Sequence, residues 1–235
     1  MGWVIVIVLI LIIVAIKKKR PSRPKSYPIF QYLSENIMTK KARKQYNTFV
    51  VIDFETTGLN PARDNIIEIG AAKICDGTIV DIFSTLVNPG RSIPAAATKI
   101  NGITNRMVRK APLIKDVLPK FLQFIGNDVL VAHNAPFDLK FLMVNAYECG
   151  YEIKNPVIDT LPLCRKLYPN CPNHKLGTVS AYLGIELEQA HRSLADVIAT
   201  ANILIKSIAL LNKQDEIKDN ERKQAKLAKT ATENG

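Results

Sequence analysis

The sequence predicts an α/β fold in which a mixed sheet opens with an antiparallel meander, continues with βα units and carries helices on both faces. Three observations lead to this fold class. Apolar, β-branched runs follow one another at residues 48–53, 66–74 and 79–87, and the pair Asp76-Gly77 between the last two is a strong hairpin signal. Shorter apolar runs downstream alternate with helical patterns, as in parallel βα units. Near the C-terminus, apolar residues recur at the helical period.

The elements of this fold can be placed in order along the chain. The first run, Thr48-Phe-Val-Val-Ile-Asp53, is continuous rather than alternating, which is typical of a strand buried on both faces. After the meander we expect helices at 94–99 and 112–125, a strand at 128–132, a helix at 135–149, a strand at 157–159, and helices at 161–167 and 175–183. The apolar face of the last helix consists of Leu194, Val197, Ile198, Ala201, Leu204, Ile205, Ile208 and Leu211.

The positive charge of the chain is concentrated at its N-terminal end. The formal net charge is +11; residues 1–47 hold ten Lys and Arg against one acidic residue, whereas residues 48–206 hold sixteen basic and fifteen acidic residues. The predicted domain is therefore nearly neutral, and its overall charge does not indicate nucleic-acid binding. The four cysteines form no CxxC pair, which argues against a disulfide scaffold and a zinc site.

Residues 3–16 form an unbroken apolar run that is followed at once by the basic residues 17–20. A helix of this length spans roughly 21 Å, short of a hydrocarbon core of about 30 Å, but snorkelling lysine stems extend its reach. A secretory signal would carry its positive charge before the apolar run. We therefore expect a single-pass transmembrane helix, with the N-terminus outside and the remainder at the cytoplasmic face of the cell membrane.

The chain is expected to divide into four parts. Residues 1–20 are the transmembrane anchor with its basic stop, and residues 21–47 are a proline- and lysine-rich linker with one short helix around Gln31–Arg43. Residues 48–212 are the folded domain. Residues 213–235 are a polar tail, rich in Lys, Glu, Asn and Gln, that we expect to be disordered.

Asp53 and Glu55 stand two residues apart at the end of the first buried strand, so their side chains point to the same side. An unpaired carboxylate at such a position is costly to desolvate, and a metal ion would compensate for that cost. The alternative is a solvated strand end with an acidic turn residue. The following Thr56-Thr57-Gly58 supplies hydroxyls and flexible backbone for the end of a substrate, or forms a plain turn.

Two further acids lie in the first turns of predicted helices. Asp138 follows Asn134, a plausible cap, and its alternative role is a favourable interaction with the helix dipole. Asp196 matches a capping box that begins at Ser193, in which the acid only satisfies a backbone amide. His191 should lie on the loop before the last helix, from which it can reach back over the site. His133 is expected to be structural.

Together the blocks Asp53-Phe-Glu55-Thr-Thr-Gly58, Asn134-Ala-Pro-Phe-Asp138 and His191-Arg-Ser-Leu-Ala-Asp196 resemble the motifs of the DnaQ-like exonucleases of the DEDDh type, which have a ribonuclease-H-like fold. The likeness runs from about Thr48 to Leu211 and is greatest to the proofreading exonucleases of bacterial DNA polymerase III. Histidine stands five residues before the last aspartate, where a sister subgroup has tyrosine. The resemblance implies a 3′→5′ exonuclease that releases nucleoside monophosphates.

The resemblance also assigns roles to individual residues. Asp53 would bridge two Mg²⁺ or Mn²⁺ ions, with Glu55 and Asp196 completing the first metal site and Asp138 helping to hold the second. His191 and the first metal would activate the attacking water, while the second metal would stabilise the leaving 3′ oxygen. The residues expected to contact the substrate are Thr56, Thr57, Gly58, Asn134 and Phe137.

Two alternatives and one partner question remain open on the sequence alone. The same motifs would suit an RNA-directed 3′ exoribonuclease, because contacts to the 2′-hydroxyl follow no simple motif. A non-catalytic, membrane-tethered nucleic-acid-binding module would be expected to lack one of the carboxylates, and all four are present. Single-stranded DNA 3′ ends are the favoured partner. The predicted anchor argues against assembly with polymerase subunits.

Overall fold

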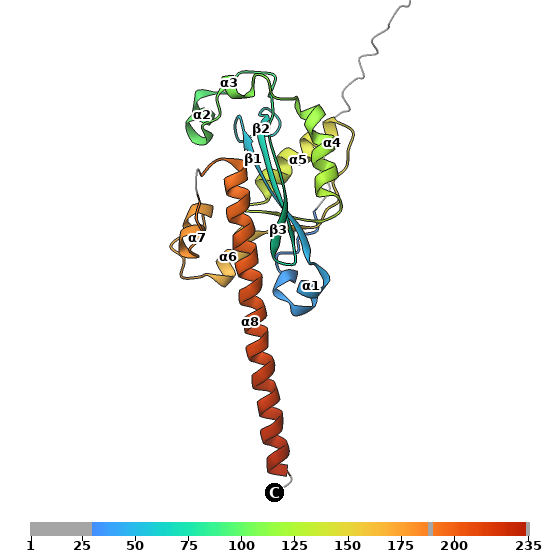
Figure 1. Cartoon of the computed structure of the whole chain (residues 1–235), viewed down its shortest axis with the longest axis vertical. Helices are drawn as coiled ribbons and strands as arrows, with labels where there is room; N and C mark the ends of the chain where they lie inside the picture. The colour runs from blue at the N-terminus through green and yellow to red at the C-terminus, as the bar shows by residue number, and fades with distance from the viewer. Residues whose placement is uncertain (1–29, 188–189, 234–235) are drawn as a thin grey trace, which may run out of the picture.

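The computed structural model describes residues 30–187 and 190–233. Its centre is one sheet of five strands in the order β3-β2-β1-β4-β5 (Figure 1). The strands are β1 (Thr48–Thr56), β2 (Ile66–Cys75), β3 (Thr78–Leu86), β4 (Val129–Ala132) and β5 (Val157–Asp159). β1, β2 and β3 pair antiparallel, whereas β4 lies parallel to β1 and β5 lies parallel to β4. The predicted meander followed by βα units is therefore confirmed.

The helices expected from the sequence are present in the expected order, and one further short helix, at Asn105–Val108, was not expected. They are α1 (Lys40–Gln45), α2 (Ala95–Asn101), α3 (Asn105–Val108), α4 (Ile114–Ile125), α5 (Pro136–Glu148), α6 (Thr160–Leu167), α7 (Leu176–Tyr182) and α8 (Ser193–Glu233), with a 3-10 turn, η1 (Asn36–Met38), before α1. The strand Asp128–Ala132 begins one residue later than predicted, and the other boundaries differ by a few residues, as helix and strand ends usually do.

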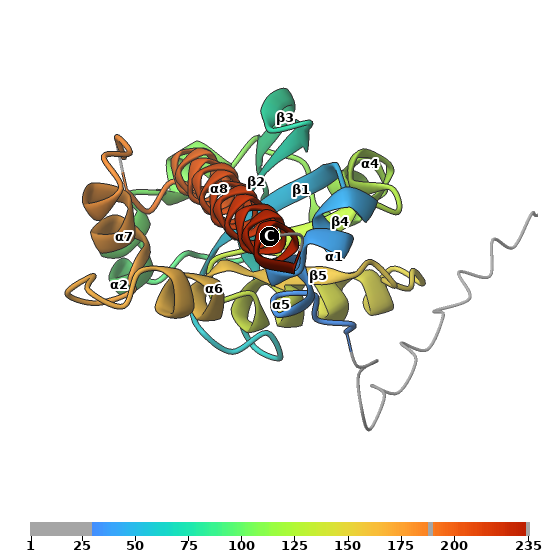
Figure 2. The same ribbon diagram turned by 90° about the horizontal axis from the view of Figure 1, so that it is seen from below.

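Helices cover both faces of the sheet, and alternate residues of β1 point to opposite faces. On one face Val50 and Ile52 pack with residues of α4 and α5, among them Phe121 and Leu142. On the other face α8 and α6 pack over the odd-numbered residues of β1. Figure 2 shows the sheet between α8 and the α4–α5 pair. Asp53 and Glu55 continue the odd-numbered face, so the fold directs them towards the start of α8.

The segment from residue 30 to residue 47 differs from the expected linker, because it packs onto the domain. Leu33 and Ile37 are buried in the core beneath α8. The backbone N–H of Leu33 donates to the carbonyl oxygen of Val157 at 2.7 Å, which extends the sheet beyond β5. The expected short helix is present as η1 and α1. Leu33 and Ile37 stand in a short stretch that shows no sustained helical or strand period, so the sequence pattern does not predict this contact.

Helix α8 also differs from expectation, because it continues through the predicted disordered tail to Glu233. Lys, Glu, Gln and Ala are good helix formers. Ion pairs of Lys40 with Asp219 and of Arg43 with Asp215 tie this part of the helix to α1. The polar composition of residues 213–235 indicates solvent exposure. It is compatible with a disordered tail and equally with a helix that extends away from the domain, as α8 does in Figure 1.

Within the described residues, α8 is long and apolar enough to cross a membrane by length and composition. Half of its apolar stretch is buried inside the protein, however, where residues such as Val197, Ala201 and Leu204 pack against β1 and β2. A core helix meets the same criteria, and we interpret α8 as one. The apolar run at residues 3–16, which carries the predicted anchor, lies outside the described residues.

Candidate active site

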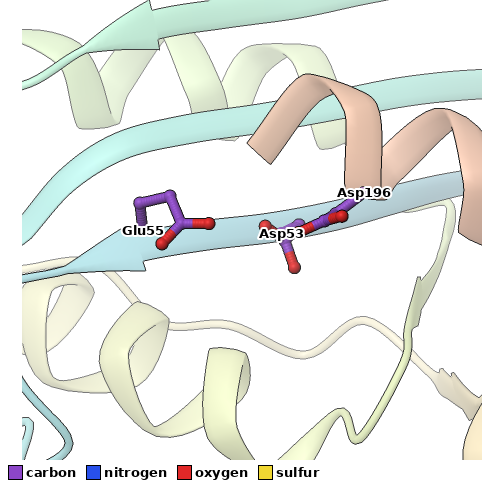
Figure 3. A group of neighbouring side chains, drawn as sticks. All are labelled: Asp53, Glu55 and Asp196. Carbon is purple, nitrogen blue, oxygen red and sulfur yellow. The ribbon is translucent and has the colours of Figure 1, made fainter. Parts of the chain in front are cut away.

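Three carboxylates meet where β1 passes beneath the first turn of α8. Asp53 and Glu55 come from β1 and Asp196 comes from α8, and one carboxylate oxygen of each lies within 4.8 Å of the others. Figure 3 shows the three side chains gathered between the strand and the helix. The two-residue spacing places the first two on one side of the strand, as predicted. Three like charges this close repel one another unless a cation or protons neutralise them.

The environment of this cluster favours a cation. Burial raises the pKa of Asp53 well above its ordinary range, and the charges of Asp138 and Asp196 raise it further. Burial raises the pKa of Glu55 to about 8, while a hydrogen bond with Asn101 acts in the opposite direction. The pKa of Asp196 is raised as well, chiefly by burial. Buried, closely spaced carboxylate oxygens are the donor set that Mg²⁺ and Mn²⁺ prefer, so these residues fit a divalent metal ion.

Asp138 reaches the same strand from the opposite side of the sheet. It lies in the first turn of α5, is 3% exposed, and its Oδ1 accepts a hydrogen bond from the backbone N–H of Phe54 at 3.0 Å. Burial is the largest cause that raises its pKa to about 8. It stands outside the three-oxygen cluster but close enough to act on the pKa of Asp53. Its second carboxylate oxygen is not engaged by the Phe54 bond.

Asn134 does not cap α5 with its side chain, which corrects that part of the prediction. Its backbone is left-handed, with φ of 68°, and the helix begins after Ala135 without a side-chain cap. The N–H of Asn134 donates instead to Oδ1 of Asp159 at 3.0 Å. Asp159 in turn is held by the hydroxyl of Ser34, which accepts its N–H at 2.8 Å. The entry to α5, and with it Asp138, is therefore fixed by β5 and the N-terminal segment.

His191 lies on the loop that enters α8, as predicted. It is exposed, its φ is 66°, and its backbone N–H donates to Oδ2 of Asp196 at 3.1 Å. Asp196 therefore satisfies the backbone amide of His191 rather than that of Ser193, which the capping-box alternative required, and it also belongs to the carboxylate cluster. The hydroxyl of Ser193 is buried and has no hydrogen-bond partner within the described structure, so a full capping box does not form.

Glu68 and Arg192 hold the start of α8 in place, a role that no sequence motif predicted. Glu68 on β2 is 3% exposed, and it accepts hydrogen bonds from Nε and Nη2 of Arg192 and from the backbone N–H of Ser193. The signal was present: an acidic residue interrupts an apolar strand that is buried on both faces. Its partner, 124 residues away, could not be read from the pattern.

Gly70 on β2 allows the start of α8 to approach the sheet closely. A Cβ added there would lie 2.6 Å from the carbonyl carbon of Ser193 and 2.7 Å from its oxygen, both backbone atoms that cannot yield locally. Gly70 pairs with Asp53 across the sheet, so a shift of α8 at this point moves Asp196 relative to Asp53. The absence of a side chain at Gly70 is thus part of the geometry of the site.

We expect Gly70→Ala to lower the exonuclease activity that the resemblance implies by about tenfold to a hundredfold, because displacements of about 1 Å are enough for such losses. Gly177→Ala in α7 is the matched control, since its Cβ would meet only Leu187 at 3.9 Å. The comparison requires the rate of DNA digestion and the circular dichroism spectrum of each variant. Wild-type rates for a well-folded Gly70→Ala protein would show that the α8 contact does not set the geometry.

The expected substrate-binding residues are only partly available for contact. The hydroxyl of Thr56 donates to the carbonyl oxygen of Gly58 at 2.6 Å, and that of Thr57 accepts from the N–H of Asn65 at 3.0 Å. Both threonine side chains therefore close the loop after β1. Phe137 is half-buried, with its ring centroid 5.2 Å from that of Phe141.

His133 is structural, as the sequence suggested. Its Nδ1 lies 2.9 Å from Oγ1 of Thr160, and its Nε2 lies 2.8 Å from the carbonyl oxygen of His174. Burial lowers its pKa, which favours the neutral ring. Both ring nitrogens are engaged in joining β4 to the loop before α7, so the ring is not available for a metal.

Without divalent metal, the protein is expected to lose thermal stability as the pH rises from about 5 to about 8. The pKa of Glu55 is about 8 in the folded chain and 4.5 ordinarily, so between these values the folded state keeps a proton that the unfolded state releases. Stability falls with rising pH wherever the unfolded state binds fewer protons. The measurement is the Tm in EDTA across this range for wild type and Glu55→Gln. An equal pH dependence for both proteins would contradict the account.

The ribonuclease-H-like sheet, with a buried carboxylate cluster beside its first strand, defines the class of metal-dependent nucleases. Comparisons with known proteins identify the family: residues 50–204 match the family model described as Exonuclease. The chain belongs to this exonuclease family.

Individual relatives agree with this assignment. The chain is 45% identical over 197 residues to the "DNA polymerase III PolC-type" protein of Clostridium perfringens, and 44% identical over 169 residues to a "DNA polymerase III subunit epsilon-like protein" of Rhodobacter capsulatus. These alignments cover 82% and 70% of this chain but only 14% and 24% of the two relatives. The solved structure "Exonuclease X in complex with 5' overhanging duplex DNA" is 32% identical, with a TM-score of 0.58 and coverage of 69% of this chain and 92% of that one.

Proposed function

We propose that this chain is a 3′→5′ exonuclease that hydrolyses the phosphodiester bonds of DNA one nucleotide at a time and releases nucleoside monophosphates. The observation that carries the proposal is the approach of Asp53, Glu55 and Asp196 to within 4.8 Å at the end of a buried strand. DNA is favoured over RNA because relatives are named as DNA polymerases and Exonuclease X was solved with duplex DNA.

The four carboxylates suit two Mg²⁺ or Mn²⁺ ions. Figure 3 shows Asp53 between Glu55 and Asp196, with one carboxylate oxygen of each within 4.8 Å of the others. Asp138 approaches from α5 on the other side, where the N–H of Phe54 holds one of its oxygens and leaves the second for a ligand. Bound there, divalent cations would activate the attacking water and stabilise the charge on the leaving 3′ oxygen. The protein holds these carboxylates in place before the substrate binds, through β1, α5 and α8.

We assign His191 the role of general base, as in the DEDDh type. Its backbone is tied to Asp196, while its side chain is exposed beside the carboxylate cluster. The ring can therefore approach a water near the metals without contributing to the core. Its left-handed backbone sets the direction in which the side chain leaves the loop.

The loop after β1 and the start of α5 would hold the terminal nucleotide. The internal hydrogen bonds of Thr56 and Thr57 shape this loop, so its backbone, including Gly58, is the part that faces the nucleotide. A Cβ on Gly58 would lie 2.5 Å from a carboxylate oxygen of Asp64, so a larger residue would disturb the loop. Asn134, which is exposed, and the half-buried Phe137 lie at the start of α5.

Digestion of matched oligonucleotides tests this proposal. A 5′-labelled DNA strand should give a ladder that shortens from the 3′ end in the presence of Mg²⁺, and EDTA should abolish it. A 3′-labelled strand should release its label as a mononucleotide. The same strand made of RNA is the matched comparison for the sugar. Internal cleavage fragments, or activity that survives EDTA, would contradict the proposal.

We also propose that residues 3–16 anchor the enzyme to the membrane, with the exonuclease domain at the cytoplasmic face. The support is the apolar run followed by four basic residues at 17–20. Fractionation of cells that express the full chain or a variant lacking residues 1–20 tests this placement. The full chain should sediment with membranes and the shortened chain should not. An equal soluble share of both would reject the anchor.

A further inference from the structure

One part of the domain carries only positive charge, although the domain as a whole is nearly neutral. Residues 82–115 contain six Lys and Arg and no acidic residue, whereas the rest of 48–206 contains ten basic and fifteen acidic residues. Seven exposed cations belong to this region or to the loop beside it. The seventh, Lys115, lies in α4, and we call the other six the basic lobe: Arg63, Arg91, Lys99, Arg106, Arg109 and Lys110. Across the described part of the chain, none of the six is paired with a carboxylate.

The basic lobe is a rigid structure rather than a loose loop. Ile93, Ile103 and Val108 are buried together against Ile67 of β2. The side chain of Asn105 accepts the N–H of Ile93 at 2.8 Å, and the hydroxyl of Thr98 donates to the carbonyl oxygen of Ile103 at 2.8 Å. Helices α2 and α3 therefore present their cations from a fixed frame, which lowers the entropy cost of binding a ligand.

The lobe borders the carboxylate cluster. Asn101, the last residue of α2, is 5% exposed and hydrogen-bonds with Glu55. Arg91 donates from Nη1 to the carbonyl oxygen of Arg63 at 2.7 Å, which joins the lobe to the loop that follows Gly58. In Figure 1, α2 and α3 lie at the end of the molecule where α8 begins, far from its C-terminal end. A ligand on the lobe therefore lies next to the site of hydrolysis.

We propose that the basic lobe binds the phosphates of the nucleic-acid strand whose 3′ end occupies the active site. This inference rests on the proposed function. The bound metals neutralise charge only locally, and the remainder of the domain carries more acidic than basic residues, so a polyanion needs another positive surface. Such contacts position the strand without reading its sequence. Ile100, 63% exposed, and Met107, 36% exposed, lie among the cations and offer apolar contact to sugars and bases.

An anionic membrane is the other polyanionic surface to which the lobe could bind. The hydrogen bond between Asn101 and Glu55 places the lobe beside the catalytic carboxylates, where a substrate strand has to pass. A lipid surface at that position would obstruct entry of the strand. The geometry therefore favours nucleic acid, and binding to anionic vesicles serves as a contrary outcome in the test.

The test neutralises three cations of the lobe in the full chain, as Arg106→Gln/Arg109→Gln/Lys110→Gln. The control removes the same charge from the exposed distal part of α8, as Lys213→Gln/Lys218→Gln/Lys223→Gln. Each protein is assayed on a single strand of about 20 nucleotides and on the p-nitrophenyl ester of thymidine 5′-monophosphate, over a range of roughly 50 to 200 mM salt. The small ester reports on the carboxylate site and on folding, because it is too short to reach the lobe.

The lobe variant should raise KM for the long strand about tenfold and reduce the slope of log KM against log salt by about 2, at roughly 0.7 per lost contact to a single strand. Its rate on the small ester and the behaviour of the control should match wild type. If the lobe variant keeps the wild-type KM and salt slope on the long strand, the inference is overturned. It is also overturned if the variant keeps the wild-type KM but loses binding to phosphatidylserine vesicles, because the lobe then binds lipid. Inactivity of wild type on both substrates would instead reject the proposed function.

Discussion

Asp53→Asn is expected to reduce the rate of DNA hydrolysis by on the order of a thousandfold or more, because it removes charge where the reaction develops it. Asp53 contributes an oxygen to the three-carboxylate cluster and lies within electrostatic reach of Asp138 as well. The neutral amide keeps the size and the strand position of the side chain. Metal affinity should fall together with the rate, and both are measured on the same preparation by calorimetry with Mn²⁺ and by single-turnover digestion.

The matched control for Asp53→Asn is Asp81→Asn, an exposed acid on β3. Because the pKa of Asp53 is raised in the folded chain, the variant should also be at least as stable as wild type in EDTA at neutral pH. If Asp53→Asn digests DNA at the wild-type rate, the carboxylate cluster has no role in the reaction. If the variant loses activity but binds Mn²⁺ as wild type does, Asp53 is not a metal ligand.

His191→Gln should lower kcat by about a hundredfold to ten-thousandfold, the usual range for loss of a general base. Its side chain is exposed and its structural contact is made by backbone N–H, so the variant should keep both folding and metal binding. The informative pattern is a lower kcat with unchanged Mn²⁺ affinity, which separates the base from the metal ligands.

His174→Gln is the comparison for His191, since the His174 ring lies 3.1 Å from the carbonyl oxygen of Tyr168, the residue that follows α6. It should change stability more than rate. A wild-type kcat for His191→Gln would exclude the histidine as the base. A loss of Mn²⁺ binding in that variant would instead mean that the ring acts through the metal site.

Local sequence signals predicted the fold well because each element is consistent over a short range. The continuous apolar run at β1, the turn pair Asp76-Gly77 and the apolar face of α8 each depend on neighbours in the chain. Asp53 and Glu55 on one side of β1 follow from the alternation of a strand alone. The prediction that a third acid, Asp196, joins them depended on all three motifs together. Taken alone, Asp196 could have been only a helix-capping residue, and it does accept a backbone N–H.

The features that the sequence did not reveal depend on contacts between distant segments. The contacts of Glu68 with Arg192 and of Ser34 with Asp159 join residues more than a hundred positions apart, and no periodicity links them. The packing of residues 30–47 onto β5 escaped notice for the same reason. The extension of α8 is a different case: its polar composition suits both a disordered tail and a solvent-exposed helix, and ion pairs with α1 favour the helix.

The fold also changes the interpretation of how charge is distributed in the domain. The even balance of residues 48–206 conceals a basic lobe next to the site and an acidic remainder. The net charge of the whole domain cannot separate the basic lobe from the acidic remainder, because the lobe is distinguished by its position beside Glu55. This arrangement lets one domain bind metal with buried carboxylates and still attract a polyanion.

The most direct test of the account is the position of Mn²⁺ in crystals grown with a nucleoside monophosphate. We expect a strong anomalous peak bounded by the carboxylates of Asp53, Glu55 and Asp196, and a second peak between Asp53 and Asp138. Asp53→Asn crystals treated in the same way should lose both. Active wild-type protein whose crystals show Mn²⁺ elsewhere, with none at these carboxylates, would contradict the central claim.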